Sequence, residues 1–218
     1  MEDRKQLNAT FAHDLRTPLT VLKGYDEILQ ASSDPFTQET ALTMAKHIGI
    51  LEKYVESMSQ LQRFEDVQAH GEQFAINAYV TRLVESAEIL SEQAGRTLTI
   101  KVNLENLPLI LDTSFISQVH NNLLANALRY SKKDVQLEYI SDEKGFYLAV
   151  VDDGSGFSES ILPEATKPYV TEEKNHSDHF GLGLSICQTL CKRHGGYLTI
   201  ENGPTGAKVS AFFNTLAK

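Results

Sequence analysis

The chain has 218 residues and a formal net charge of −9, with 41% hydrophobic and 22% charged residues. This composition is typical of globular proteins and excludes disordered and collagen-like chains. The acidic balance argues against non-specific nucleic-acid binding, because that binding needs Lys and Arg side chains to neutralise phosphates. The longest apolar run, 146–151, is too short to cross a bilayer, so we expect a soluble piece.

Two long helices are predicted in the N-terminal third. Apolar side chains recur every three or four residues between residues 4 and 30, and a second series runs from Met44 to about Phe64. The segment Ala31–Pro35 interrupts the pattern, which predicts an antiparallel hairpin. A single hairpin cannot bury both stripes, so we expect two copies to form a four-helix bundle. The first stripe consists of Leu7, Phe11, Leu15, Pro18, Leu22, Tyr25 and Leu29.

The polar stretch from Asp66 to Gln73 separates this hairpin from the rest of the chain and predicts two domains, 1–68 and 69–218. In the second domain, helices and strands alternate in a pattern that predicts an α+β two-layer sandwich. The segment from Ser158 to Phe180 is long, polar and without a period, so we interpret it as a lid. The expected helices are 77–94, 113–130 and 182–194, and the expected strands are 97–103, 135–140, 146–151, 197–201 and 207–213.

The first candidate site is the string Phe11–Leu19, FAHDLRTPL. His13 lies off the apolar stripe, and a neutral imidazole that faces solvent is a competent nucleophile. Asp14 can orient the other ring nitrogen and take up the proton, while the Thr17 hydroxyl, one turn further on the same face, can position a water. Pro18 removes one backbone hydrogen bond, so the helix is expected to bend there. A histidine of this kind, taken alone, is usually a solvated surface residue.

Three further segments carry polar groups suited to a nucleotide. Asn122, Asn126 and Arg129 are spaced to share one helical face, where amide oxygens suit Mg²⁺ and a guanidinium suits phosphate. Asp152 ends a predicted buried strand and can accept a hydrogen bond from adenine N6, while Gly154 and Gly156 let the backbone approach a purine. Gly181 and Gly183 open a helix whose N–H groups can face phosphates. An ordinary amphipathic helix, a hairpin turn or a plain helix start would show the same patterns.

Cys187, Cys191 and His194 fall at i, i+4 and i+7, which is a possible spacing for metal ligands on one helical face. No fourth ligand is evident, and cysteine is commonly buried as a small apolar residue, so core packing is the favoured interpretation. Two cysteines within one helix also make no disulfide framework, which fits a reducing compartment.

Together, these segments resemble the sensor histidine kinases of two-component systems. His-Asp-Leu-Arg-Thr-Pro-Leu resembles their H-box, and the later segments occur in the family's order as N-box, first glycine box, lid and second glycine box. The resemblance implies a dimeric helical hairpin followed by a Bergerat (GHKL ATPase-like) domain. It implies that His13 accepts the phosphoryl group from ATP, that Asp14 assists, and that Thr17 serves a phosphatase reaction.

The resemblance also implies ATP and Mg²⁺ as ligands. Asn126 would hold the metal, Asp152 would read the adenine, and Tyr130 would pack against the base. The sequence departs from the family at Thr166 in the lid and at His179 and Phe180, just before the second glycine box. The other positions implied for the nucleotide are Asn122, Arg129, Gly154, Gly156, Lys167, Gly181, Leu182, Gly183 and Leu184.

The implied partners are a second copy of the chain and the receiver domain of a response regulator, with no nucleic acid. Few residues precede His13, so we expect this chain to be the cytoplasmic part of a longer protein that an N-terminal region anchors at the membrane. Two alternatives stay open. One is an ATPase clamp or serine kinase, which would use ATP independently of His13. The other is a non-catalytic scaffold that dimerises and binds nucleotide or a partner without transferring phosphate.

Overall fold

The computed structural model describes residues 2–105, 107–171 and 181–216. Within these ranges, the side chains of 2–14, 60–66, Lys53, Ser57 and Met58 are outside the description. The described residues form two compact units, with the boundary along the chain between Asp66 and Val67. In the described part of the chain, no helix is long and apolar enough to span a membrane.

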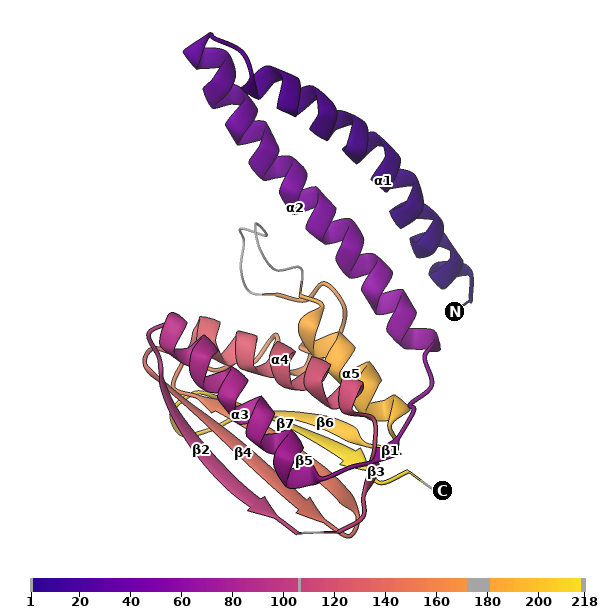
Figure 1. The fold of residues 1–218 in the computed structure, drawn as a ribbon, viewed down its shortest axis with the longest axis vertical. Coiled ribbons are helices and arrows are strands. Elements are labelled where there is room, and N and C mark those ends of the chain that lie inside the picture. Colours follow the sequence, from indigo (N-terminus) through magenta and orange to yellow (C-terminus); the bar gives the residue numbers. More distant parts are fainter. Residues whose placement is uncertain (1, 106, 172–180, 217–218) are drawn as a thin grey trace. The chain divides into compact units, whose positions relative to one another are not determined.

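The first unit is the predicted hairpin, made of α1 (Glu2–Gln30) and α2 (Pro35–Asp66). Asp34 starts α2 by accepting hydrogen bonds from the backbone N–H and the hydroxyl of Thr37, at 2.9 and 2.6 Å. The bond from the Thr37 hydroxyl is the main reason why the pKa of Asp34 lies below its ordinary value. Pro18 lies inside α1, which continues through it as one bowed helix (Figure 1).

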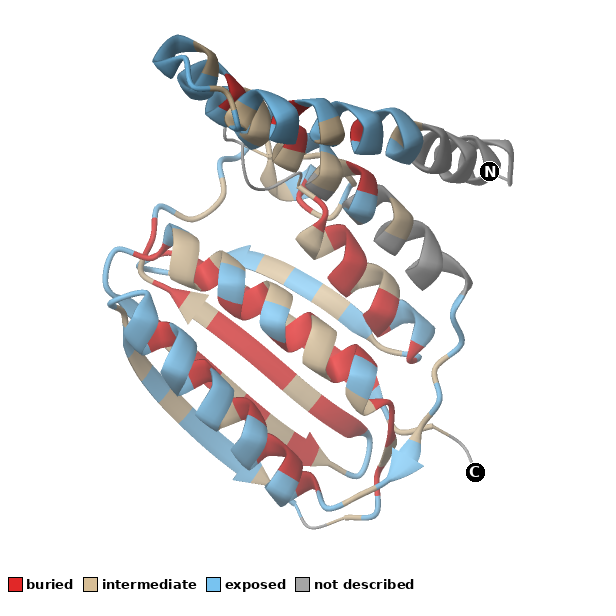
Figure 2. Cartoon of the chain, turned by 45° about the horizontal axis from the view of Figure 1, so that its top comes forward, coloured by how far each residue is buried: buried red, intermediate tan, exposed pale blue. Residues whose placement is uncertain are grey.

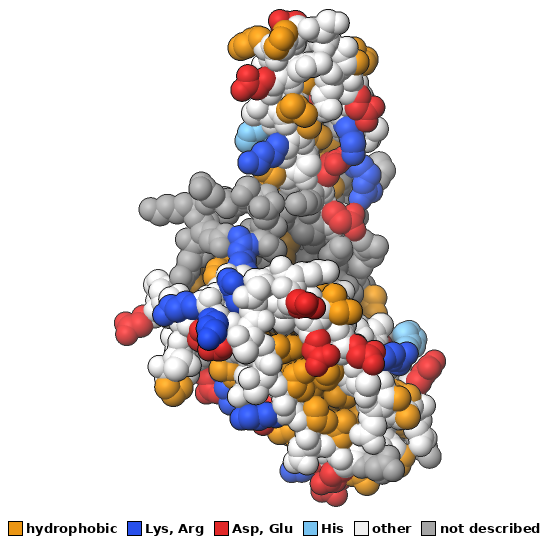
Figure 3. Space-filling view, turned by 60° about the vertical axis from the view of Figure 1, so that its left-hand side comes forward, with side chains coloured by type: hydrophobic (Ala, Val, Ile, Leu, Met, Phe, Trp, Pro, Cys, Tyr) orange, Lys and Arg blue, Asp and Glu red, His pale blue; other side chains and the backbone are white. Residues whose placement is uncertain are grey.

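The contact between α1 and α2 is not made by the whole predicted stripe. Leu19, Ala41, Ile48 and Val55 are buried, whereas Leu22, Tyr25 and Leu29 of that stripe are exposed. The face of α1 that contacts α2 is therefore rotated by one residue, about 100°, from the predicted face. Packing against α2 determines which of these two neighbouring faces is buried. Hydrophobic side chains consequently stand among charged ones on the hairpin surface (Figure 3).

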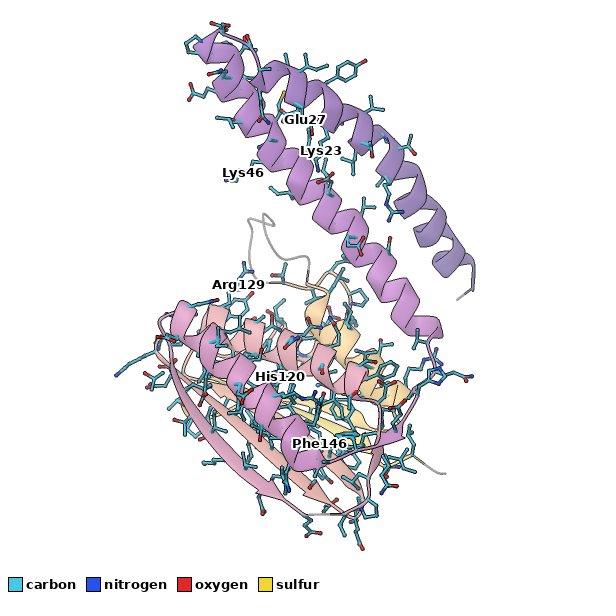
Figure 4. All side chains as sticks on the ribbon, in the orientation of Figure 1. Lys23, Glu27, Lys46, His120, Arg129 and Phe146 are labelled. Carbon is cyan, nitrogen blue, oxygen red and sulfur yellow. The ribbon has the colours of Figure 1, made fainter. Side chains whose placement is uncertain are left out.

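One carboxylate lies in the interior of the hairpin. Asp26 is only 2% exposed; its Oδ2 accepts a hydrogen bond from the Gln30 amide, but its Oδ1 is buried without a partner among the described residues. An unsatisfied buried polar atom costs about 1–3 kcal/mol. Its neighbour Glu27 is exposed, which provides a control on the same helix (Figure 4).

We expect Asp26→Leu to raise the free energy of hairpin unfolding by about 1 kcal/mol or more, because a leucine removes the unsatisfied carboxylate and adds apolar contact. Thermal unfolding followed by circular dichroism measures this, with Glu27→Leu as the exposed control. A lower melting temperature for Asp26→Leu than for the wild type would show that the carboxylate has a favourable partner.

The second unit is the predicted sandwich. Its main sheet has the strand order β2-β4-β5-β7-β6, with β2 and β4 parallel and every other pair antiparallel. Three helices lie side by side over one face of this sheet (Figure 1). The helices are α3 (Ile76–Gln93), α4 (Thr113–Tyr130) and α5 (Gly183–Arg193), and the strands are β2 (Thr97–Leu104), β4 (Asp134–Asp142), β5 (Gly145–Asp152), β6 (Tyr197–Asn202) and β7 (Ala207–Asn214).

These helices and strands lie within two residues of their predicted limits at each end, and the predicted fold class is confirmed. The sequence did not predict the short pair formed by β1 (Glu72–Gln73) and β3 (Ile110–Leu111), or the 3₁₀ turn η1 (Leu162–Glu164). The core lies between the helices and the central strands, where burial is most continuous (Figure 2). It therefore supports α4, α5 and the end of β5, the elements that carry the predicted nucleotide residues.

Candidate active site

Helix α4 carries the two predicted amides on its flank. The helix begins where Asp112 accepts hydrogen bonds from the N–H groups of Ser114 and Phe115, at 3.0 and 3.2 Å. Burial pulls the pKa of Asp112 upwards, but the hydrogen bonds outweigh it and the pKa lies below its ordinary value. The helix packs on the sheet through residues that include Leu123, Leu124 and Ala127, which leaves Asn122, Asn126 and Arg129 at its more accessible side.

Asn126 lies next to the start of α5. A Cβ atom on Gly183 would lie 3.8 Å from Nδ2 of Asn126, and the Asn126 side chain makes no hydrogen bond to any described residue. At the same place, Leu182 precedes the helix and offers no side-chain cap to the first N–H groups of α5. An unengaged amide therefore adjoins a helix N-terminus that attracts anions.

Asn122 has a different environment. Its Nδ2 is buried without a hydrogen-bond partner among the described residues. On α5, burial raises the pKa of the Cys187 thiol to about 12. Cys187, Cys191 and His194 are all buried, as residues packed in the core are.

Asp152 ends β5 with its carboxylate partly committed to the protein. Its Oδ1 accepts hydrogen bonds from the N–H groups of Gly154, at 2.8 Å, and Ala207, at 3.3 Å. No hydrogen bond from a described residue reaches Oδ2. Burial raises the pKa of Asp152 against the lowering effect of these two bonds. The side chain, 9% exposed, thus retains one acceptor oxygen for a ligand.

At Gly154 and Gly156, neighbouring atoms of the protein leave no room for a Cβ atom. A Cβ atom on Gly154 would lie 2.4 Å from the carbonyl oxygen of Tyr130, and one on Gly156 would lie 2.6 Å from Oδ1 of Asn202. Gly156 also has a φ of +71°, which disfavours other residues. The close contact at Gly154 brings the end of α4 against the end of β5. Tyr130, the last residue of α4, is 47% exposed there, with the Arg129 guanidinium 5.6 Å from its ring centre.

The predicted lid is described only up to Thr171, and the description resumes at Gly181 just after it. His179, Phe180 and Lys174, a lysine of the lid that could also contact phosphate, lie outside the described residues. The two flanks of the lid meet, since the Tyr169 N–H donates to the Gly181 carbonyl at 3.1 Å. Lys167, a predicted phosphate contact, forms a surface ion pair with Glu164. Leu182 is buried, so only its backbone is available to a ligand, while Leu184 is half-buried.

The predicted phospho-acceptor string lies in α1. The His13 and Asp14 side chains are outside the described residues, and their roles stay predictions. Thr17 is described and exposed, as a residue that serves an external partner must be. The structure therefore assembles the nucleotide candidates within the second unit and carries the phospho-acceptor candidates on the first.

Comparison with known proteins assigns both units. Residues 3–67 match the family model of the His Kinase A (phospho-acceptor) domain, and residues 111–216 match that of the histidine kinase-, DNA gyrase B- and HSP90-like ATPases. The chain belongs to the sensor histidine kinases. The predicted H-box and both glycine boxes fall within the matched ranges, as does the N-box.

Several curated sensor histidine kinases are similar along nearly the whole chain. The signal transduction histidine-protein kinase BaeS of Escherichia coli is 27% identical over 209 residues, which are 93% of this chain and 45% of BaeS. The nisin biosynthesis sensor protein NisK of Lactococcus lactis is 30% identical over 206 residues, which are 91% of this chain and 46% of NisK. The chain thus spans about half the length of these relatives.

Solved histidine kinases share the fold. Full-length ShkA in complex with AMPPNP matches with a TM-score of 0.74 and 19% identity, over 98% of this chain and 47% of ShkA. The Acinetobacter baumannii histidine kinase AdeS matches with a TM-score of 0.61 and 22% identity, over 94% of this chain and 98% of that one. The combination of hairpin and sandwich domain is therefore that of the histidine kinase core.

Two histidines of this kinase core serve packing instead of chemistry. His120, on α4, is fully buried beside Tyr139, with Nε2 2.9 Å from the phenol oxygen. Figure 4 labels His120 together with Phe146, a buried residue of β5. His194 is equally buried, and its Nε2 accepts the Asp112 N–H at 2.8 Å. Burial is the main cause that lowers the pKa of both imidazoles, so both are neutral in the folded kinase core.

We therefore expect the sandwich domain to lose stability on acidification. Unfolded histidines bind protons below a pH of about 6.5 and the folded ones resist, so the free energy of unfolding falls as the pH drops towards the folded-state pKa, by at most about 1.4 kcal/mol per pH unit for each histidine. Urea unfolding between pH 7.5 and 5, followed by near-ultraviolet circular dichroism, measures this slope. His120→Gln should make the slope shallower, whereas the exposed His47→Gln should not; an unchanged slope for His120→Gln would contradict the assignment.

Proposed function

We propose that this chain is an ATP-dependent protein-histidine kinase core that phosphorylates its own His13 and passes the phosphoryl group to an aspartate of a response regulator. The observation that carries the proposal is the combination, in one chain, of the H-box on a phospho-acceptor hairpin with an ATPase domain in which Oδ2 of Asp152 and the Asn126 amide make no hydrogen bond to a described residue.

The nucleotide would bind across α4, α5 and the end of β5. Oδ2 of Asp152 would accept the adenine N6–H, with the exposed Tyr130 ring against the base. The triphosphate would extend towards the uncapped N-terminus of α5 at Gly181–Leu184, where backbone N–H groups and the helix dipole favour phosphate. Arg129 and Lys167 are proposed as additional phosphate contacts, the latter after leaving Glu164.

A magnesium ion fits the residues present. The amide oxygen of Asn126 is a ligand of the type that Mg²⁺ accepts, and this amide makes no hydrogen bond to the described residues. When bound, Mg²⁺ would neutralise charge on the β- and γ-phosphates. Asn122 cannot activate a water as a carboxylate base would, because an amide does not take up a proton, and this favours transfer to an imidazole over hydrolysis.

His13 would supply the nucleophile. A ring nitrogen of His13 attacks the γ-phosphorus in line, the bond between that phosphorus and the β–γ bridging oxygen breaks, and ADP leaves. Asp14 would hold the other ring nitrogen and take up its proton. The phosphoryl group then moves to a receiver aspartate, which restores the free imidazole. On the same helix, the exposed Thr17 hydroxyl would position a water that hydrolyses the regulator's phosphoaspartate to aspartate and inorganic phosphate, which is the phosphatase reaction.

Two further proposals concern assembly. The exposed apolar stripe of the hairpin fits a second copy in a four-helix bundle, and next to it lies an apolar hollow of about 550 Å³ lined in part by Leu22, Phe36, Met44, Ile48 and Leu51. Membrane attachment through a region outside this chain is proposed from the resemblance alone.

The experiment that tests the proposed function is incubation with γ-labelled ATP and Mg²⁺. A histidine kinase becomes labelled on protein, and the label is lost in acid and kept in alkali. A protein that consumes ATP without becoming labelled would instead be an ATPase.

A further inference from the structure

The turn between β6 and β7 meets the loop after β5 at two points, although the residues that touch lie as many as 55 positions apart in sequence. Asn202 is the last residue of β6 and Ala207 is the first of β7. The Gly203 N–H donates to the Gly206 carbonyl at 2.7 Å and closes the turn. Both ends of this turn contact the loop from Asp152 to Phe157, which begins with the proposed adenine ligand.

At the first point, the Asn202 amide binds one residue of the loop twice. The Phe157 N–H donates to Oδ1 of Asn202, and Nδ2 of Asn202 donates to the Phe157 carbonyl, both at 2.8 Å. The side-chain amide thus takes the place of a paired strand and fixes both the position and the orientation of Phe157. Gly156, next to it, lies so close to the amide that a Cβ atom would collide with it.

At the second point, the turn packs on the carboxylate itself. The Ala207 N–H donates to Oδ1 of Asp152, and a Cβ atom on Gly206 would lie 2.3 Å from the Asp152 carbonyl oxygen and 2.7 Å from Oδ1. The turn therefore holds the oxygen of Asp152 that faces the protein, which directs the other oxygen towards a ligand. The Asn202 amide holds the far end of the same loop.

We propose that Asn202 is a positioning residue for nucleotide binding: through its paired hydrogen bonds to Phe157, it keeps the Asp152–Phe157 loop in the conformation that receives the adenine. This inference rests on the proposed function of that loop. Both halves of the amide are needed, because one donates and the other accepts. Asn202→Asp keeps the acceptor but sets an anion against the Phe157 carbonyl, and Asn202→Ala removes both bonds.

The effect of Asn202 should be local. Asn202 is exposed, and hydrogen bonds at the surface contribute little to global stability, so the melting temperature should fall by no more than about 4 °C in either variant. Without the Asn202 hydrogen bonds, in contrast, the nucleotide itself has to order the Asp152–Phe157 loop when it binds. The free-energy cost of this ordering weakens nucleotide binding. Nucleotide affinity and stability should therefore change independently.

The test measures ADP binding by calorimetry, together with KM for ATP and kcat of autophosphorylation, for Asn202→Asp and Asn202→Ala. We expect the dissociation constant and KM to rise about tenfold in Asn202→Ala and further in Asn202→Asp, with kcat at saturating ATP within about twofold of the wild type. The matched control is Asn103→Asp. Asn103 is an exposed residue of β2 whose side chain makes no hydrogen bond to a described residue, so this variant should change neither the dissociation constant nor KM.

An unchanged ADP dissociation constant in folded Asn202→Ala would overturn the inference, as would a loss of kcat with KM unchanged. A wild-type protein that binds ADP but forms no phosphohistidine would refute the proposed kinase function and leave the inference to be decided by the ADP constants. A wild-type protein that binds no ADP would overturn both. Should Asn202→Asp fail to fold, Asn202→Ala decides.

Discussion

Asp152→Asn is expected to weaken ATP and ADP binding at least 100-fold while leaving the fold intact. The amide oxygen can still accept the Gly154 and Ala207 N–H groups that Oδ1 holds in the wild type. The second atom becomes an NH₂ donor that faces the N6–H donor of adenine, so an attractive contact is replaced by an unsatisfied pair of donors. Sites built on such a hydrogen bond discriminate strongly against a group that cannot make it, by a factor on the order of 10⁴ in the best cases.

The melting temperature of Asp152→Asn distinguishes a loss of nucleotide binding from misfolding. Burial raises the folded-state pKa of Asp152, so its stabilising contribution is present at a pH below the unfolded value and is lost as the pH rises through the folded value. At neutral pH the ionised carboxylate therefore lowers stability, and Asp152→Asn should unfold at the same temperature as the wild type or at a higher one.

The adjacent Asp153 provides the matched control. Its carboxylate accepts the N–H groups of Lys132 and Lys133, at distances from 2.7 to 3.1 Å, and the bond from Lys133 is the main cause that lowers its pKa. Asp153→Asn should therefore lower the melting temperature and change nucleotide affinity less than about threefold. Calorimetric titration with ADP that gives Asp152→Asn an affinity near that of the wild type would remove Asp152 from the adenine site.

Much of the sandwich domain was predictable because its periodicity and end signals agree. In α4, the apolar spacing of Leu123, Leu124 and Ala127 defines the buried face, and Asp112 stands where a helix cap is needed. The alternation in β4 gives its buried and half-buried faces directly. Such elements are determined by local sequence, and the packing of the domain agrees with them.

The hairpin shows what local periodicity leaves open. Leu19 and Leu22 are both plausible members of an apolar stripe, and only the position of α2 decides that Leu19 is buried. A carboxylate at a buried position, as at Asp26, contradicts the pattern that sequence reasoning relies on. The exposed remainder of the stripe is what the proposed second copy would cover.

In the candidate site, too, some residues could be predicted from the sequence and others could not. Asp152 and Asn126 are candidates because their residue types suit a nucleotide and Mg²⁺ and because their order resembles a family motif. The structural reason for Gly156 was not accessible, because it lies in the Asn202 side chain, which reaches the loop only through the register of β6 and β7. Nothing in the sequence around Asn202 signals this role, apart from the Gly203–Gly206 turn directly after it.

The central claim is that His13 accepts the phosphoryl group, and the expected result of His13→Gln is complete loss of labelling. Glutamine keeps polarity and length but has no basic ring nitrogen that can attack phosphorus. Because the nucleotide residues all belong to the other unit, His13→Gln should bind ADP as the wild type does. His47→Gln, in the exposed part of α2, is the matched control and should be labelled normally.

The most direct measurement is therefore incubation of the wild type, His13→Gln and His47→Gln with γ-labelled ATP and Mg²⁺, with acid and alkali treatment of the protein-bound label afterwards. The account predicts acid-labile, alkali-stable label on the wild type and on His47→Gln, and none on His13→Gln. Acid-stable label, or label that persists on His13→Gln, would contradict it. ATP turnover at an equal rate in all three proteins without protein-bound label would contradict it as well, in favour of an ATPase.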